Sequence, residues 1–525
     1  MSMADARLSS PAGSTHPVVL RRRMVDLSLI ALSALIPLAL ALAISTQVSR
    51  PSYVLLFALL GGAIGVVVLI VSPRYEMSLV IVAIYLGLLE GPAKLGSGGH
   101  ESAAVVRNVL IFSVSLGVVL RMVVKKEKLM LPPLSAWVLA FVALVLVEAL
   151  NPNTHGILKA LGGFRQQLQW VPFFFFGYAV IRSKDRFRKL FLLLGVIALA
   201  NGVVNVYQTK LSPGQLAAWG PGYRDLVYGT VAPGGGGGGL TGRTYLVEGV
   251  ARVRPPGLGS DSGFGGGVGV LALAGTLALV ATGRLRRRWP VLLLCLGALA
   301  AIVTGLGRLQ VIGAVFALLT FLALTVGAGG RVSRSLATLL TVVIVAIPAG
   351  LVLISVVGGG TFSRYEAIAP ENLGSGKDTK TNSLSHIPTL IAAKPFGVGL
   401  GAVGAAASFG GTQTELLEGH RVSSETQYNF VTNELGLPGL ILWVGFTGRL
   451  LVLALRRLRR IADVELRLYL AAILATFIAF TLMGFSGPTM AAAPFGTFFW
   501  LTGGIIAYWF AGPGRLKAAA PTEAA

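Results

Sequence analysis

Apolar residues occur along this chain in long unbroken runs, and polar residues gather in the short stretches between them. A helix of about 20 apolar residues is long enough to cross the hydrocarbon core of a bilayer. The pattern predicts an all-α polytopic integral membrane protein with about 14 transmembrane helices and two long extracytoplasmic loops. The predicted spans are 27–47, 53–72, 77–93, 103–124, 132–150, 158–181, 188–208, 263–283, 289–306, 308–328, 333–357, 428–453, 467–487 and 492–512.

Composition leads to the same class. The chain has 525 residues, of which 54% are hydrophobic and 12% charged, whereas soluble domains carry about a quarter charged residues. A soluble fold could not cover so much apolar surface. The single cysteine, Cys295, lies inside an apolar run, which excludes a disulfide framework and a cysteine-based metal site.

The net charge of +23 does not indicate a nucleic-acid partner, because most Lys and Arg stand in short clusters between apolar runs. With the predicted spans, these clusters all fall on one side of the membrane, and the positive-inside rule makes that side cytoplasmic. Both termini are then inside, and the first span is a signal anchor. The clusters are 21–23, 125–128, 182–189, 284–288, 331 with 334, 456–460, and 515 with 517.

The resulting organisation has two cytoplasmic tails, three groups of helices and two outer loops. Residues 234–239 are all glycine, so the first loop contains a stretch that forms no core. The mixed second loop is expected to hold short helices. The segments are an N-terminal tail (1–26), seven helices (27–208), the first loop (209–262), four helices (263–357), the second loop (358–427), three helices (428–512) and a C-terminal tail (513–525).

Polar residues inside the predicted spans concentrate in the outer half of the membrane, where they suggest a polar cavity open to the outside. For Glu90, Arg107 and Glu148, at span ends, two interpretations stay open: the side chains line this cavity, or they extend to the interface. The full set is Glu90, Arg107, Glu148, Arg165, Asn201, Asn205, Arg308 and Glu434.

Three segments after residue 250 combine glycine with proline or charged residues. The first is Arg252-Val253-Arg254-Pro255-Pro256-Gly257. The second is Thr304-Gly305-Leu306-Gly307-Arg308. The third is Pro395-Phe396-Gly397-Val398-Gly399, followed by Glu425 and then by Glu434-Leu435-Gly436-Leu437-Pro438-Gly439.

In this order, the three segments resemble the O-antigen ligase and O-antigen polymerase superfamily, over about residues 250 to 500. The resemblance implies transfer of glycan from an undecaprenyl-diphosphate carrier on the outer face of the bacterial inner membrane, without a metal or other cofactor. The implied partners are the lipid-linked glycan donor, a glycan acceptor, membrane lipid and other proteins that assemble envelope polysaccharide. No nucleic acid is expected.

This chemistry assigns candidate residues. Breaking a glycosyl–diphosphate bond needs positive charge on the departing diphosphate and a base for the acceptor hydroxyl. Arg254 and Arg308 are the catalytic candidates for the first role. Glu425 is the candidate for the second, because it stands nine residues before Glu434, at the position that is reactive in the resembled family. The substrate-binding candidates are Arg165, Arg252, Arg364 and His420.

Two departures from the family pattern bear on the choice of activity. Ligases carry His-Asn where this chain has Glu425-Thr426, and Gly307 replaces the serine of a Ser-Arg pair. The acidic residue favours a polymerase, with a ligase as the alternative and a lipid-linked oligosaccharide flippase or transporter as the second alternative. Transporters usually bind substrate near the midplane instead. Residues 424–427 also fit a capping box, so Glu425 has a structural interpretation as well.

Overall fold

A computed structural model describes part of the chain. The described residues are 76–96, 107–117, 120, 131–154, 156–228, 244–247, 250–259, 263–282, 289–326, 384–404, 406, 416–417, 420–421, 426–491 and 493–515. The chain divides into two compact units, one of Glu76–Asn108 with Met130–Ala525 and one of Met1–Tyr75 with Val109–Leu129. The larger unit holds the fold described below. The predicted spans 27–47, 53–72 and 333–357 lie outside the described residues.

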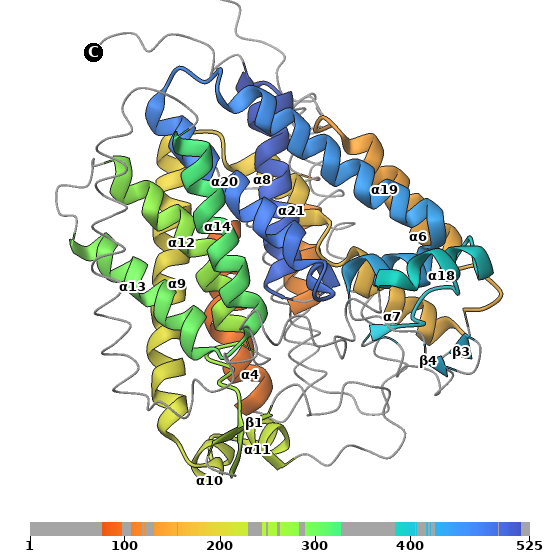
Figure 1. Ribbon diagram of the computed structural model, residues 1–525, viewed down its shortest axis with the longest axis horizontal. Coiled ribbons are helices and arrows are strands. Elements are labelled where there is room, and N and C mark those ends of the chain that lie inside the picture. Colours follow the sequence, from red (N-terminus) through yellow and green to blue (C-terminus); the bar gives the residue numbers. More distant parts are fainter. Residues whose placement is uncertain are drawn as a thin grey trace, which may run out of the picture. The chain divides into compact units, whose positions relative to one another are not determined.

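The described elements are almost all helical (Figure 1). The first group comprises α3 (Glu76–Ile84), the π-helix η1 (Tyr85–Leu89), α4 (Glu90–Gly96), α6 (Ser135–Glu148), α7 (Ile157–Leu168), α8 (Pro172–Val180) and α9 (Lys184–Lys210). The second comprises α10 (Pro213–Ala217), α11 (Pro221–Tyr228), β1 (Thr244–Val247), β2 (Val250–Val253), α12 (Phe264–Thr282), α13 (Trp289–Thr304) and α14 (Arg308–Val326). The third comprises α18 (Ile387–Ala393), β3 (Leu416–Leu417), β4 (His420–Arg421), α19 (Gln427–Leu458), α20 (Val464–Met483), η5 (Thr489–Ala491), α21 (Phe495–Ile506) and η6 (Ala507–Ala511). A further helix covers Arg107–Gly117.

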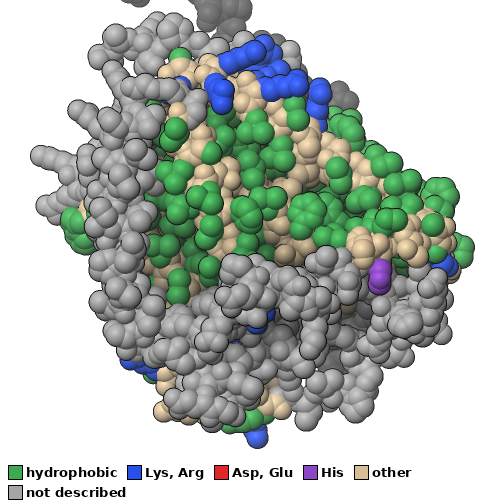
Figure 2. Space-filling view, in the orientation of Figure 1, with side chains coloured by type: hydrophobic (Ala, Val, Ile, Leu, Met, Phe, Trp, Pro, Cys, Tyr) green, Lys and Arg blue, Asp and Glu red, His purple; other side chains and the backbone are tan. Residues whose placement is uncertain are grey.

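Five of the described helices are long and apolar enough to cross a membrane, namely α9, α12, α14, α19 and α20. The polarity of the surface supports the same conclusion. Helix α7 exposes Ile157 (69%) and Leu161 (50%) but buries Lys159 (2%), the reverse of what water would select. Apolar side chains cover the middle of the face in Figure 2, and Lys and Arg gather at one end. These features indicate a membrane-embedded helical protein.

The core has two parts. Helix α12 is buried along most of its length and packs against α9, α13, α14 and α20. The second part is a layer of aromatic rings between α6, α8, α19 and α21, in which Trp500 contacts Phe174, Trp443 and Phe446 at centroid distances of 5.3–6.4 Å. Edge-to-face and tilted ring contacts of this kind contribute to helix packing in a membrane, where the hydrophobic effect does not drive helices to associate.

Two of the basic clusters, 182–189 and 456–460, lie near each other at one end of the larger unit. The Nζ of Lys184 lies 2.6 Å from Oδ2 of Asp463, which directly precedes α20. Arg188 pairs with Glu465, and Arg457 donates to the carbonyl of Phe510. Helices α10 and α11 lie at the opposite end (Figure 1). This arrangement is consistent with the prediction that these clusters lie on the same side of the membrane. The full topology stays a prediction.

Both predicted outer loops contain ordered elements. The first, 209–262, holds α10, α11 and the antiparallel hairpin β1–β2, in which Thr244 pairs with Val253. Helix α10 begins with a capping box formed by Ser212 and Gln215. The second, 358–427, holds the short helix α18 and the hairpin β3–β4. The short helix expected there is thus present in α18.

The structure divides the predicted span 158–181 into two helices, α7 and α8. Pro172 is the first residue of α8 and has no N–H to continue the hydrogen bonds of α7. Gln169 and Trp170, in the turn between the two helices, face Ala491 instead, with Trp170 Nε1 3.4 Å from its carbonyl oxygen. The polar half of the segment and the turn after it therefore contact Val403 and Ala491 of the later loops.

Helix α19 is interrupted at Gly436, whose φ of 62° and ψ of −158° are not helical. The interruption separates Leu437 N–H from Asn433 C=O, which a continuous helix would join. Segment 394–398 supplies both missing partners. Leu437 N donates to Pro395 O over 2.8 Å, and Val398 N donates to Asn433 O over 2.7 Å. The third sequence motif is therefore one packed unit built from two distant pieces.

We expect Gly436→Ala to destabilise the protein and Gly448→Ala, in the same helix, to be neutral or stabilising. A Cβ at Gly436 would lie 2.2 Å from Pro395 O, and the backbone strain alone costs roughly 1–3 kcal/mol. A Cβ at Gly448 meets nothing within 4 Å, and alanine favours a helix by about 0.5–1 kcal/mol. Thermal unfolding of both variants in detergent measures the difference. Equal melting temperatures would contradict the packing at the interruption.

Candidate functional site

Segment 394–406 lies between α7 and α19 and is hydrogen-bonded to both. On the α7 side, Gln166 Nε2 donates to Val403 O over 2.9 Å, and Ala406 N donates to Gln166 Oε1 over 3.1 Å. Thr154 Oγ1, just before α7, accepts from Leu400 N over 3.0 Å. With the two bonds at the α19 interruption, the segment is fixed along its whole length.

Glu434 is the one acidic residue of α19, and its side chain is completely buried beside segment 394–406. Gln167 Nε2 donates to its Oε2 over 2.7 Å, and Val403 N lies 3.5 Å from its Oε1. Lys159, exposed by 2%, is close enough to interact with it electrostatically. A buried carboxylate needs such partners, since an isolated charge would be strongly unfavourable in this environment. Glu434 therefore ties α7, α19 and the inserted segment together.

The first sequence motif is bound to α9. Gly257 is held by Gln208, which donates from Nε2 to Gly257 O (3.1 Å) and accepts from Gly257 N at Oε1 (2.9 Å). Leu258 N donates to Asn201 Oδ1 over 3.0 Å. Gly257 has a φ of 65°, and a Cβ there would lie 2.8 Å from the side-chain oxygens of Asn201 and Asn205. The turn after Arg254 thus fits onto a buried row of amides.

Next to this turn lies a buried ion pair. Arg107 Nη1 is 2.6 Å from Glu90 Oε1, and the guanidinium stands 5.5 Å from the centre of the Trp170 ring. Arg165, half-buried on α7, lies within electrostatic reach of both charged groups. Gly91, the next residue after Glu90, packs against Gly259. Among the described residues, the cluster contains two guanidinium groups and one carboxylate, a net positive charge that an anion would balance.

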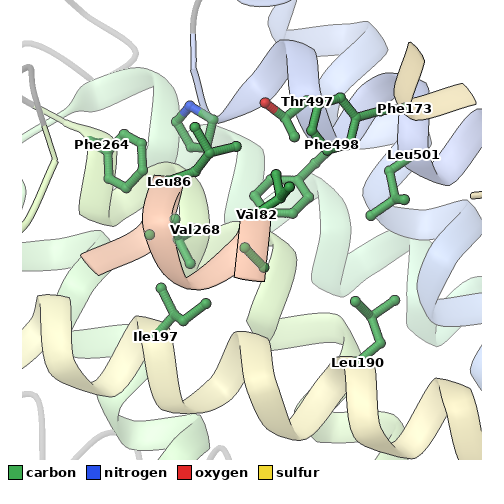
Figure 3. Close-up of a pocket in the computed structure, with 13 residues that line it drawn as sticks. Val82, Leu86, Phe173, Leu190, Ile197, Phe264, Val268, Thr497, Phe498 and Leu501 are labelled. Atoms are coloured by element: carbon green, nitrogen blue, oxygen red, sulfur yellow. The ribbon is translucent and has the colours of Figure 1, made fainter. Parts of the chain in front are cut away.

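An apolar pocket adjoins this cluster (Figure 3). It is a small cavity with about 20 Å³ of free volume, and Thr497 is the one polar side chain among the residues that line it. Leu86, on the π-helix just before Glu90, and Phe173, just after the Trp170 turn, both point into it. The remaining lining residues are Val82, Ala83, Gly87, Leu190, Ile197, Phe264, Val268, Pro494, Phe498 and Leu501.

The start of α19 is capped by Thr426. Its hydroxyl accepts from Asn429 N over 3.1 Å and donates to the Asn429 side chain. Gln427 instead accepts from Met490 N over 3.0 Å. The capping box expected at residues 424–427 is therefore wrong. The helix is capped by Thr426, two residues after the expected Ser424, and the cap does not involve Glu425.

The structure describes some of the predicted site residues with their side chains, others by their backbone alone, and others not at all. Arg165 joins the Glu90–Arg107 pair. Arg254 is half-buried between β2 and the anchored Gly257, and Arg308 is exposed at the first residue of α14. For Arg252 in β2 and His420 in β4 only the backbone is described, and Arg364 and Glu425 lie outside the described residues. The segments of Arg254 and Arg308 are linked through Gln310, whose Nε2 donates to Gly263 O over 3.2 Å.

Sequence reasoning missed several residues that build the site. The interfacial interpretation of Glu90 and Arg107 is wrong, because both side chains turn inward and pair. Lys159, Gln166 and Gln208 were not among the predicted site residues. The amides at 166, 167 and 169 are unusual within an apolar segment, and this pattern could have drawn attention to α7. Their partners are main-chain groups far away in the sequence, which no spacing rule identifies.

Neither a family model, nor a curated protein, nor a solved structure matches this chain.

We expect the Glu90–Arg107 pair to show strong energetic coupling. Glu90→Gln or Arg107→Gln alone leaves an uncompensated buried charge, which typically costs about 3–5 kcal/mol. The double variant Glu90→Gln with Arg107→Gln should lose clearly less than the sum of the two. Unfolding of the four proteins in detergent gives the coupling energy. Additive losses would show that the two charges do not act as a pair.

Proposed function

We propose that this protein is a membrane glycan transferase that uses an undecaprenyl-diphosphate-linked oligosaccharide as donor. It acts at the outer face of the bacterial inner membrane, without a metal, and polymerises repeat units. The observation that carries the proposal is the excess positive charge of Glu90, Arg107 and Arg165 directly beside the apolar pocket.

The pairing of these two features matches the chemistry of the donor. A polyprenyl diphosphate joins an anionic head to a long apolar tail. Arginine is well suited to phosphate because its planar guanidinium donates two parallel hydrogen bonds. Within the described part of the chain, Glu90 Oε2 and Arg107 Nε are buried without a hydrogen-bond partner. Buried polar groups of this kind are usually paired in a native protein, so the cluster has capacity for a further polar ligand.

In the proposed reaction, the acceptor hydroxyl oxygen attacks the anomeric carbon of the donor. The bond between that carbon and the diphosphate oxygen breaks, and its electron pair leaves with the diphosphate. Arg254 and Arg308 stabilise the charge that develops there. Glu425 takes the proton of the acceptor hydroxyl. Arg165 belongs to the anion-binding cluster, and Arg252, Arg364 and His420 are proposed to contact the glycan or the diphosphate.

The interruption of α19 favours a second candidate, since transporters often bind substrate at the ends of broken helices. In this chain, however, Asn433 O and Leu437 N at the interruption are already paired with Val398 and Pro395. The interruption therefore serves packing, which supports a transferase over a flippase. A ligase shares the proposed chemistry and differs in its acceptor.

The lipid-linked glycans that accumulate in cells without the protein separate these activities. Single repeat units on the carrier are expected and would indicate a polymerase. Full-length polymer on the carrier would indicate a ligase. Repeat units confined to the inner leaflet would instead indicate a flippase and contradict the proposal.

We expect Arg254→Lys and Arg308→Lys to lose most of their transfer activity while inserting normally, because lysine keeps the charge but loses the planar fork. Arg224→Lys, at an exposed site on α11, is the matched control and should retain full activity. Transfer to a glycan acceptor by the purified protein in vesicles measures the effect. Wild-type rates for both site variants would remove these arginines from the reaction.

Glu425→Gln should insert normally and bind the donor, yet fail in transfer. Glutamine has nearly the same shape but cannot take a proton near neutral pH, and loss of a general base typically costs about a hundred-fold to ten-thousand-fold in rate. Glu418→Gln in the same loop is the control. If Glu425→Gln makes polymer at the normal rate, the base lies elsewhere, and His420 is the next residue to replace.

A further inference from the structure

Two buried glutamines on different helices bind the two outer loops in the same way. Gln208 on α9 uses both amide atoms on the main chain of Gly257, and Gln166 on α7 uses both on Val403 and Ala406. Their side chains are exposed by 4% and 8%. Each amide thus offers one donor and one acceptor to the main chain of a loop.

The chemistry of the anchored groups explains the residue type. A buried N–H or C=O left without a partner costs about 1–3 kcal/mol, and an apolar side chain at either position would leave two such groups. A charged side chain would introduce a desolvation penalty of its own. A neutral amide of the right length pairs with both main-chain groups of the loop and adds no buried charge.

The anchored points lie next to the proposed reaction centre. Gly257 follows Arg254 by three positions, and the two intervening residues are the prolines 255 and 256, which restrict the backbone between the anchor and the arginine. Val403 also contacts Glu434, and Gly404 packs against Phe430 in the first turns of α19. The Gln166 anchor therefore fixes one end of the stretch whose other end leads into α19.

We propose that Gln208 and Gln166 are positioning residues, which hold the two outer loops in the places that glycan transfer requires. The inference rests on the proposed function, and it assigns to these amides a role in turnover rather than in fold stability alone. A displacement of about 1 Å at a reaction centre can lower a rate by roughly a hundred-fold. Loss of an anchor should therefore reduce kcat far more than it changes the KM for the donor.

The test combines hydrogen exchange with transfer kinetics on the full-length protein in lipid nanodiscs. The variants are Gln208→Leu, Gln166→Leu, Gln208→Glu and Gln166→Glu, with Arg224→Leu at an exposed site of α11 as the control. For the Leu variants, exchange at Gly257 or Ala406 should accelerate by roughly two- to twelve-fold, the equivalent of one net hydrogen bond. Their kcat should fall by about ten-fold to a hundred-fold. The control should match the wild type in both measurements.

The Glu variants supply a readout that a merely structural role would not give. A protonated carboxyl carries one O–H donor and one carbonyl acceptor, the same pair as the amide, whereas a carboxylate has no donor. Relative to wild type at each pH, both Glu variants should therefore transfer well at low pH and poorly as the pH rises. This comparison lies within one folded protein, so it holds even if a Leu variant does not fold.

The outcomes separate the two proposals. Unchanged exchange at the anchored amides would overturn the anchoring, whatever the activity. Faster exchange with normal kcat, or a Glu variant that follows the wild-type pH profile, would overturn the positioning role. A wild-type protein that transfers no glycan would refute the proposed function, and the exchange experiment, which needs no glycan, would still decide the anchoring.

Discussion

The backbone at Gly436 needs partners for an N–H and a C=O that α19 itself cannot join, and much of the site depends on how they are supplied. In a low-dielectric interior an unpaired main-chain group is strongly unfavourable. Pro395 and Val398 provide the two hydrogen bonds, so the helix and the segment 394–406 form one unit. Because Gln166 and Glu434 hold the rest of that segment, α7 becomes part of the same unit.

A second constraint is electrostatic. Glu90, Arg107 and Arg165 come from three separate stretches of the chain, and burial makes their mutual interactions stronger than they would be in water. Gly91, next to Glu90, packs against Gly259 in the anchored turn after Arg254, and Leu86, one helical turn before Glu90, lines the apolar pocket. The proposed function centres on a lipid diphosphate because such a molecule carries an anionic head that the cationic cluster could balance and an apolar tail suited to an apolar surrounding.

The amides complete the arrangement. Asn201, Gln208, Gln166 and Gln167 serve main-chain or carboxylate groups, and each uses a neutral side chain to do so. Loops that carry chemistry are usually the more mobile parts of a protein. Here the described parts of both predicted outer loops are attached to helices at defined points, which restricts where their candidate residues can lie.

The sequence by itself determined the membrane class and most of the described helices, because long apolar runs and their lengths are local properties of the chain. It also picked out the motifs around Arg254, Gly397 and Glu434, since glycine and proline there mark special backbone positions. It did not reveal the division of 158–181, the interruption of α19 or the inward pairing of Glu90 with Arg107. Each of these depends on a partner far away in the sequence, such as Ala491, Pro395 or Trp170. Only the tertiary structure decided them, because the free energy of a buried polar group is set by what lies opposite it.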